Sequence, residues 1–384
     1  MIRKSKKKEY LVVGAGLSGA VIAGVLARRG HKITIIERRG HVGGNLFDER
    51  DENGFTVQRY GPHIFHTNNE RVYRFIKEYG AWDDFSLECM AHMKGKYTPS
   101  PFNFQTVDDY FDTEKAKAIK ASIAARFGER KKASVLEMLE SDDKTVKEYA
   151  RFLFENDYRP YTAKQWGIPP EKIDASVLRR VPVLFSYERG YFDDRYQCMP
   201  KEGFTRFIEK IIRHKNIKLK LNTDASSIIS IADGKLLING RESDKTVVYT
   251  GALDELLCGK YGALPYRSLR FEYRTENVDS FQPAPVVQYP EAPLYTRITE
   301  YSKLPPQKTH GRTLIAVEYP IKHESGVTEP YYPIPTSESL SLYKKYRESV
   351  EGIPNLVVCG RLGDFKYYNM DAAILRALEI CDTI

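Results

Sequence analysis

The first sixty residues combine a strand, a glycine turn and a second strand in the order that a dinucleotide-binding unit requires. An apolar strand at 9–13 runs into Gly14, Gly16 and Gly19. The first glycine permits a tight turn, the second lets the backbone approach a pyrophosphate, and the third lets the following helix pack on the strand. Glu37 ends the second strand, where an acid can hydrogen-bond an adenosine ribose. The unit therefore predicts a dinucleotide site, with the pyrophosphate on free N–H groups at the helix start.

A second pair of glycines, Gly43 and Gly44, follows this unit. Two successive positions without a Cβ can fold against a further length of cofactor, which favours FAD over NAD. An ordinary glycine pair in a loop is the alternative interpretation.

Composition and cysteine spacing limit the class of protein. With 384 residues, of which 42% are hydrophobic, the chain can bury a large core in two or three subdomains. We expect no membrane span, because no apolar run is long enough, and no signal peptide, because no apolar segment follows the basic start. The odd number of cysteines and the absence of CxxC spacing predict a reducing, cytoplasmic location and no metal site; they are Cys89, Cys198, Cys258, Cys359 and Cys381.

The net charge of +8 is compatible with nucleic acid, a membrane surface or a small anionic substrate. Part of the excess lies in the first eight residues, and no nucleic-acid motif is present. We therefore expect no nucleic-acid partner and favour a diphosphate substrate.

The middle of the chain predicts helices at Thr113–Phe127 and Val146–Phe154. Aromatic residues, a hydroxyl and a lysine then gather at 158–166, before a Gly/Pro stop. Such a cluster can stack a nucleobase, or it can simply pack a helix into a core.

Alternating residues predict strands in the second half. Residues 217–250 indicate strands that return to the cofactor domain, and 266–273, 286–289, 296–299 and 313–319 indicate an antiparallel sheet. Strand character also begins at 179–187. Arg297 lies within this sheet and is either a functional residue or an ordinary surface arginine.

The C-terminus predicts a second contact with the cofactor. A strand at 355–359 ends in Gly360 and Arg361, and a helix with polar residues at its start follows at 372. Its first N–H groups would face negative charge on a flavin ring.

These patterns predict an α/β protein with a Rossmann-like FAD-binding domain, a helical subdomain and an antiparallel β-sheet subdomain. The FAD-binding domain is discontinuous, at 1–85, 200–260 and 350–384. The helical domain covers 100–170, and the antiparallel sheet, the substrate domain, covers 176–199 and 265–340.

Several motifs are spread over nearly the whole chain, in this order: GAGLSGA at 14–20, ERRGHVGGN at 37–45, YGPHIFHT at 60–67, YTAKQWG at 161–167, RVPV at 180–183, YTRITE at 295–300, EYP at 318–320, EPYYP at 329–333, and GRLG with YYNM at 360–370. With them the chain resembles the bacterial UDP-galactopyranose mutase family.

The resemblance implies an FAD isomerase that interconverts UDP-galactopyranose and UDP-galactofuranose with no net redox change. In the family the flavin acts reduced, as FADH⁻, and ring contraction proceeds through a flavin N5–sugar adduct. The family often forms homodimers and serves galactofuranose and cell-wall polysaccharide biosynthesis.

The resemblance also implies site residues. Arg180 and Arg297 match the arginines that clamp the diphosphate, and Arg361 and His63 match residues beside the flavin. Substrate-binding matches are Tyr161, Thr162, Trp166, Tyr191, Phe192, Gln288, Tyr332 and Tyr367. Cofactor-binding matches are Gly14, Gly16, Ser18, Gly19, Glu37, Arg38, Gly43, Gly44, Asn45, His63, Ile64, Arg361, Asn369, Met370, Asp371, Ala372, Ile374 and Leu375. The stretch 173–180 resembles the family's mobile loop.

Four positions depart from the family pattern: Leu87, Leu184, Gln288 and Asn369. They leave the sugar and base open, because losing a polar partner shifts preference between related substrates. The alternatives are a mutase for dTDP-fucose or UDP-N-acetylgalactosamine, an amine-oxidase-like FAD oxidoreductase, and a non-catalytic binding protein.

Overall fold

The first unit of the fold is a five-stranded parallel sheet. The structure, a computed structural model, describes residues 7–167 and 181–384. The strands run in the order β12-β2-β1-β16-β22. Their bounds are β1 Glu9–Val13, β2 Lys32–Ile36, β12 Ile217–Lys220, β16 Thr246–Tyr249 and β22 Leu356–Val358. The central strand β1 pairs with β2 and β16, so the glycine turn that follows it opens at the carboxyl edge of the sheet.

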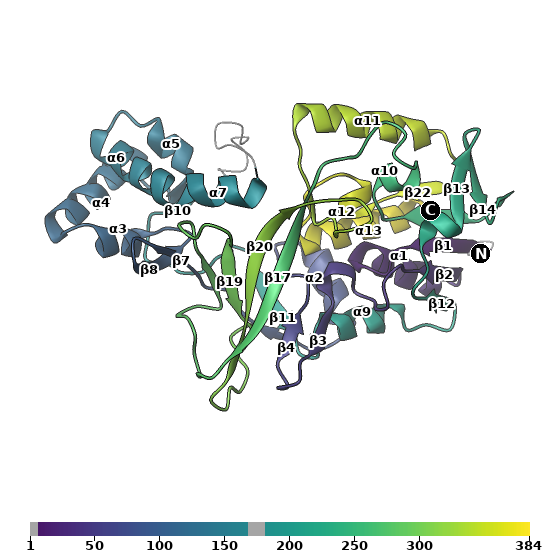
Figure 1. Ribbon diagram of the computed structural model, residues 1–384, viewed down its shortest axis with the longest axis horizontal. Helices are drawn as coiled ribbons and strands as arrows, with labels where there is room; N and C mark the ends of the chain where they lie inside the picture. Colours follow the sequence, from purple (N-terminus) through teal and green to yellow (C-terminus); the bar gives the residue numbers. More distant parts are fainter. Residues whose placement is uncertain (1–6, 168–180) are drawn as a thin grey trace.

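Helix α1 (Leu17–Arg28) lies at the centre of this unit. Eight of its residues are buried, because α13 (Met370–Thr383) and α9 (Phe204–Ile212) pack against it (Figure 1). A helix that is apolar on nearly every side needs such cover. The first and last segments of the chain are thereby held together.

Smaller elements surround the parallel sheet. The strands are β3 Asp48–Arg50, β4 Thr56–Gln58, β5 Phe65–Thr67, β6 Trp82–Asp84, β11 Tyr196–Pro200, β13 Ile229–Ala232, β14 Lys235–Ile238 and β15 Arg241–Glu242. The helices are η1 Gly44–Leu46, α2 Glu70–Lys77, η4 Ala225–Ser227, α10 Leu253–Leu256, α11 Ser337–Glu351 and α12 Gly360–Gly363.

The second unit is a seven-stranded sheet in the order β21-β17-β20-β19-β18-β7-β8. Neighbours are antiparallel except β18 and β7, which are parallel. The bounds are β7 Cys89–Met93, β8 Lys96–Ser100, β17 Tyr266–Glu276, β18 Val286–Gln288, β19 Arg297–Glu300, β20 Thr313–Lys322 and β21 Tyr332–Pro333. The long strands β17 and β20 run between the cofactor unit and the helices at the other end of the molecule (Figure 1).

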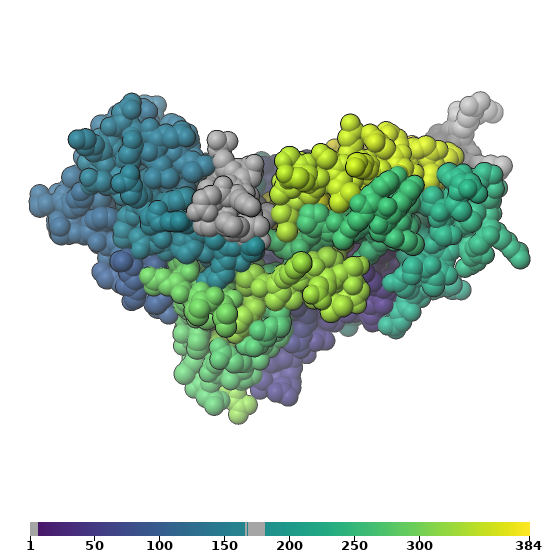
Figure 2. All heavy atoms as spheres, turned by 45° about the horizontal axis from the view of Figure 1, so that its top comes forward, coloured from purple at the N-terminus to yellow at the C-terminus, as the bar shows by residue number. Residues whose placement is uncertain are grey.

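Those helices form the third unit, which lies at one end of the molecule (Figure 2). Its elements are α3 Phe104–Tyr110, α4 Thr113–Phe127, β9 Lys132–Ala133, α5 Val135–Leu139, α6 Lys144–Leu153, the π-helical turn η2 Phe154–Tyr158, α7 Arg159–Trp166 and β10 Val183–Leu184. Asp112, Ser134 and Asp143 accept from backbone N–H groups at the starts of α4, α5 and α6. Such caps fix where each helix begins.

The helix predicted at Thr113–Phe127 is confirmed at both ends. The helix predicted at Val146–Phe154 begins two residues earlier, because Asp143 caps it. Within the described residues, no helix is long and apolar enough to cross a membrane.

One of the strand predictions differs from the structure. Within 176–199, β10 pairs with β9 of the helical unit and β11 pairs with β5 and β6 of the cofactor unit, not with the seven-stranded sheet. Pro182, which offers no N–H to a ladder, precedes β10. Strands β12 and β16 join the parallel sheet, and β14 forms a separate antiparallel sheet with β13 and β15. Because Ile229 and Leu236 share a hydrophobic cluster with Val13 of the parallel sheet, the predicted return of 217–250 to the cofactor unit is not contradicted.

Candidate functional site

A cavity of about 610 Å³, here named the nucleotide cavity, opens at the carboxyl edge of the parallel sheet. Thirteen of the cofactor-binding residues expected from the sequence line it: Gly14, Gly16, Ser18, Gly19, Glu37, Arg38, Gly43, Gly44, Asn45, His63, Arg361, Asn369 and Met370. They come from both ends of the chain, as the contact between α1 and α13 requires.

The backbone of the first glycine turn, at 14–19, contacts the backbone of Gly43 and Gly44. Gly14 has a φ of 100°, which favours glycine, and a Cβ on Gly19 would clash with the carbonyl oxygen of Gly14. Gly43 donates its N–H to the Ala15 carbonyl at 2.9 Å, and a Cβ on Gly44 would lie 3.0 Å from the Gly16 Cα. These glycines therefore line one side of the cavity with backbone atoms alone, and we call this surface the glycine floor.

Glu37 is held at the end of β2. Glu37 is 7% exposed. Its Oε2 accepts a hydrogen bond from the Ala15 N–H at 2.8 Å, and its Oε1 accepts one from the Arg39 N–H at 3.0 Å. The acid is thus fixed against the glycine turn, where a dinucleotide ribose binds in Rossmann folds.

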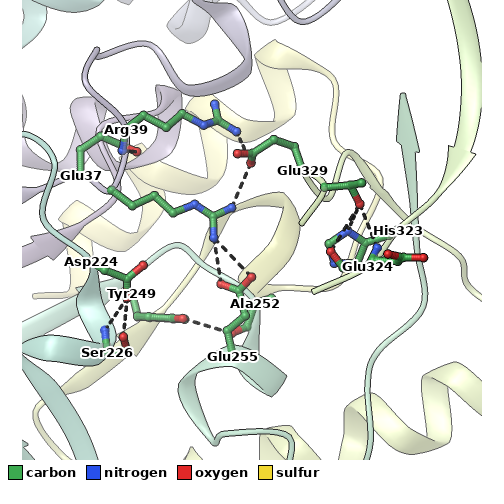
Figure 3. Close-up of polar contacts among 12 residues, drawn as sticks. Glu37, Arg39, Asp224, Ser226, Tyr249, Ala252, Glu255, His323, Glu324 and Glu329 are labelled. Carbon is green, nitrogen blue, oxygen red and sulfur yellow. Dashed lines mark hydrogen bonds and ion pairs between the residues drawn. The ribbon is translucent and has the colours of Figure 1, made fainter. Parts of the chain in front are cut away.

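Beside Glu37, two arginines and two glutamates form an ionic cluster. Arg38 pairs with Glu255 and Glu329, and Glu329 also accepts from Arg39 (Figure 3). Burial disfavours the charged Arg38 guanidinium, but the two carboxylates outweigh it and raise the pKa of Arg38. Glu329 precedes β21, so the cluster links the seven-stranded sheet to the nucleotide cavity.

The first turns of α1 and α13 have no side-chain cap, although both begin at the nucleotide cavity. The first N–H groups of α1 can therefore bind an anion, whereas in α13 the Asp371 carboxylate accepts the Ala372 N–H at 2.7 Å. Five expected cofactor residues do not line this cavity: Ile64, Asp371, Ala372, Ile374 and Leu375. Ile64 lines the second cavity, and Ile374 is fully buried in the core.

The second cavity, of about 500 Å³, lies between the cofactor unit, the seven-stranded sheet and the helical unit. Ten residues expected at the site line it: His63, Tyr161, Thr162, Tyr191, Phe192, Gln288, Arg297, Tyr332, Arg361 and Tyr367. His63, Arg361, Asn369 and Met370 line both cavities, so the two meet there. We call these four residues the junction.

His63 is neutral at the junction. Burial, reinforced by the charge of Arg361, lowers the pKa of His63 to about 4. Its Nδ1 lies 2.8 Å from the Gly61 carbonyl oxygen, which can only accept, so the proton of the neutral ring is on Nδ1. Nε2 is therefore left with a lone pair.

Arg297 is fixed by a buried carboxylate. Its Nε donates to the Oε2 of Glu318 at 2.7 Å, and Glu318 is 1% exposed. Burial disfavours the Arg297 charge, but Glu318 outweighs it and raises the pKa of Arg297. The guanidinium thus stays charged at the second cavity, where it can bind a phosphate.

Sequence reasoning missed Arg267, which lines this cavity in addition to Arg297 and Arg361. It is 7% exposed on β17, its Nη1 lies 3.4 Å from the Gln165 carbonyl oxygen, and its guanidinium lies 4.8 Å from the Tyr332 ring centroid. Arg361 lies on the same ring at 4.5 Å. A cation on the buried face of a strand was the available signal. Glu318, though noted within the strands, was also not expected at the site.

Some expected residues cannot be placed or do not face the cavity. Arg180 and the stretch 173–180 lie outside the described residues, as does the side chain of Trp166. Of the four departures, Leu87, Gln288 and Asn369 line the second cavity, and Leu184 does not. Gln288 donates to the Ser100 hydroxyl at 2.8 Å. Among the described residues there is no group of three or more side chains that could hold a metal ion.

A Rossmann-like dinucleotide cavity that meets an arginine-lined second cavity defines a protein that holds a dinucleotide beside another ligand. The family model for UDP-galactopyranose mutase matches residues 156–367, and that for an NAD(P)-binding Rossmann-like domain matches residues 12–79. The chain belongs to the UDP-galactopyranose mutase family, whose members are isomerases.

Individual relatives cover nearly the whole chain. A probable UDP-galactopyranose mutase of Klebsiella pneumoniae is 36% identical over 98% of this chain and 94% of its own. A dTDP-fucopyranose mutase of Escherichia coli is 32% identical over 97% of both chains. The crystal structure of a reduced UDP-galactopyranose mutase has a TM-score of 0.72 at 18% identity, over 98% of this chain and 93% of that one, and confirms the fold.

Proposed function

We propose that the protein is a flavin-dependent mutase that interconverts UDP-galactopyranose and UDP-galactofuranose, with FAD in the nucleotide cavity and the nucleotide sugar in the second cavity. The observation that carries the proposal is the junction, where His63, Arg361, Asn369 and Met370 border both cavities. A cofactor ring and a sugar bound there are in direct contact.

The residues of the nucleotide cavity suit FAD. The glycine floor leaves room for a pyrophosphate at the start of α1, and Glu37 suits the adenosine ribose. At the start of α13 the N-cap residue Asn369 makes no side-chain hydrogen bond, and the N–H groups that precede Ala372 face negative charge on a bound flavin ring. Reduced FAD, as FADH⁻, supplies the nucleophile for the anomeric carbon when it is bound.

The residues of the second cavity suit a nucleoside diphosphate sugar. Arg297, whose Nε is occupied by Glu318, keeps its two Nη groups for the diphosphate. Binding and neutralising the departing diphosphate is the catalytic task of this arginine, in which Arg180 joins it. His63, with its proton on Nδ1, presents Nε2 at the junction as a hydrogen-bond acceptor.

A mutase for a 6-deoxy sugar such as dTDP-fucose is the second candidate. Leu87 lines the second cavity and is 4% exposed, and an apolar side chain suits a methyl group better than a hydroxyl. The dTDP-fucopyranose mutase relative supports this candidate.

The cysteines support the cytoplasm as the location. All five are free thiols, and four of them are buried. Unpaired cysteines are usual in proteins of reducing compartments.

A chromatographic assay of UDP-galactofuranose with the FAD-loaded protein, with and without dithionite, tests the proposal. We expect UDP-galactopyranose to form only under reduction. Conversion of dTDP-fucofuranose but not of UDP-galactofuranose would favour the second candidate. Consumption of oxygen with oxidation of the sugar would contradict both.

A further inference from the structure

Asp157 is a carboxylic acid in the second cavity to which the proposed function gives no role. It lies in the π-helical turn η2, between α6 and α7, and is 4% exposed. It lines the cavity together with Tyr161 and Thr162, which follow on α7. π-Helical turns occur often at functional sites, because the extra residue re-aims the side chains around it.

One carboxylate oxygen of Asp157 has no hydrogen-bond partner within residues 7–167 and 181–384. This oxygen, Oδ1, is buried. Lys164, the cation that acts on it, donates instead to the carbonyl oxygens of Tyr289, Pro290 and Ala292, which uses all three of its protons. A buried acceptor that receives no hydrogen bond is unfavourable. Because Asp157 also lines the second cavity, a ligand there meets a carboxyl whose hydrogen-bonding capacity is not fully used by the described residues.

The Asp157 carboxyl keeps its proton up to about neutral pH. Burial raises the pKa of Asp157 to about 7, and the charge of Lys164 only partly opposes this. The charge of Asp157 in turn adds to burial in raising the pKa values of Tyr110, Tyr158 and Tyr161. A neutral carboxyl carries one O–H donor and one carbonyl acceptor.

Asp157 lines the second cavity from the helical unit and does not line the nucleotide cavity. A chain of contacts leads from Arg361 over the Tyr332 ring to Arg267, and from Arg267 to the Gln165 carbonyl on α7. If the sugar is at the junction and the diphosphate is on Arg297, as in the proposed function on which this step rests, the base reaches the helical unit.

We propose that Asp157 recognises the base of the nucleotide sugar. Its carboxyl would accept a hydrogen bond from the N3–H of uracil or thymine and donate one to an adjacent carbonyl oxygen. An imide edge presents one donor beside one acceptor, which is the complement of a neutral carboxyl. Tyr161 and Thr162 then contact the same nucleoside. Asp157 is thus a specificity residue, remote from the reacting atoms.

The test compares UDP with N3-methyl-UDP, which lacks the N3–H, by calorimetry on the FAD-loaded protein. We expect methylation to weaken binding to the wild type by about ten- to hundredfold. The leucine of Asp157→Leu offers neither donor nor acceptor, so this variant should bind UDP more weakly. Methylation of N3 should change its affinity by less than about twofold. Asp157→Asn keeps a donor and an acceptor and retains the discrimination. Asp142→Leu, at an exposed acid of the same unit, is the control and behaves as the wild type.

Equal effects of methylation in the wild type and in Asp157→Leu would overturn the inference, as would tighter binding of GDP than of UDP by the wild type. If either occurs while the reduced protein still converts UDP-galactofuranose, the proposed function stands and only the role of Asp157 fails. If the wild type binds no UDP, both fail. If Asp157→Leu does not fold, Asp157→Asn decides the test, because this substitution changes the side chain least. Loss of the preference for UDP over N3-methyl-UDP in Asp157→Asn would also overturn the inference.

Discussion

Replacing Glu318 by Gln tests whether the buried carboxylate holds Arg297 for an anion. Glu318 accepts the Arg297 Nε–H at 2.7 Å, and its side chain is 2% exposed, against 25% for Arg297. Glu318→Gln keeps a neutral acceptor but leaves the guanidinium charge uncompensated. Breaking a buried ion pair costs about 3–5 kcal/mol, and we expect the lower end, about 3 kcal/mol, because part of Arg297 faces the cavity.

A bound diphosphate would replace the missing charge. With saturating UDP, the deficit of Glu318→Gln in the free energy of unfolding should therefore shrink to about 1 kcal/mol. Urea unfolding of the FAD-loaded protein, with and without UDP, measures both values. A deficit that is the same with and without UDP would refute the reasoning. Glu272→Gln, which breaks an exposed Arg–Glu pair on β17, is the matched control and should leave the unfolding free energy unchanged.

Two further predictions follow from the glycine floor and from His63. Gly16→Ala should fold, because its Cβ would meet nothing closer than the Gly44 Cα at 3.7 Å, but the amount of FAD that it retains, measured by absorbance, should be lower by about tenfold or more. Gly19→Ala should be destabilised even without FAD. Equal FAD retention by Gly16→Ala and the wild type would contradict this prediction. Since the pKa of His63 is about 4 when folded and its ordinary value is 6.5, unfolding takes up a proton between these values. The free energy of unfolding should thus fall by at most about 3 kcal/mol as the pH drops through this window, and His63→Gln should lose that part of the pH dependence.

Local sequence patterns predicted the cofactor unit well. Gly14, Gly19 and Glu37 do their work through backbone conformation and the end of one strand, which nearby residues determine. The helix at Thr113–Phe127 was likewise predicted, because Asp112 before it and Gly128 after it mark its ends. The motif resemblance found the family and ten residues that line the second cavity, which composition and spacing alone could not.

Contacts between distant segments were not predictable in this way. Strands β7 and β8 join the seven-stranded sheet through a parallel pair with β18, almost 200 residues later in the chain. Arg267 and Asp157 were missed because each sits in an ordinary strand or helix pattern, and only burial at the shared cavity sets it apart. The contact between Glu318 and Arg297 depends on the register between β19 and β20, in which the two residues are paired.

The most direct test of the account is a crystal structure of the reduced, FAD-loaded protein with UDP-galactopyranose. The account predicts the flavin ring beside His63 and Arg361, the diphosphate on Arg297 and the anomeric carbon at the junction, in contact with the ring. A nucleotide sugar bound outside the second cavity, or one with its base at the junction and its sugar at the helical unit, would contradict it.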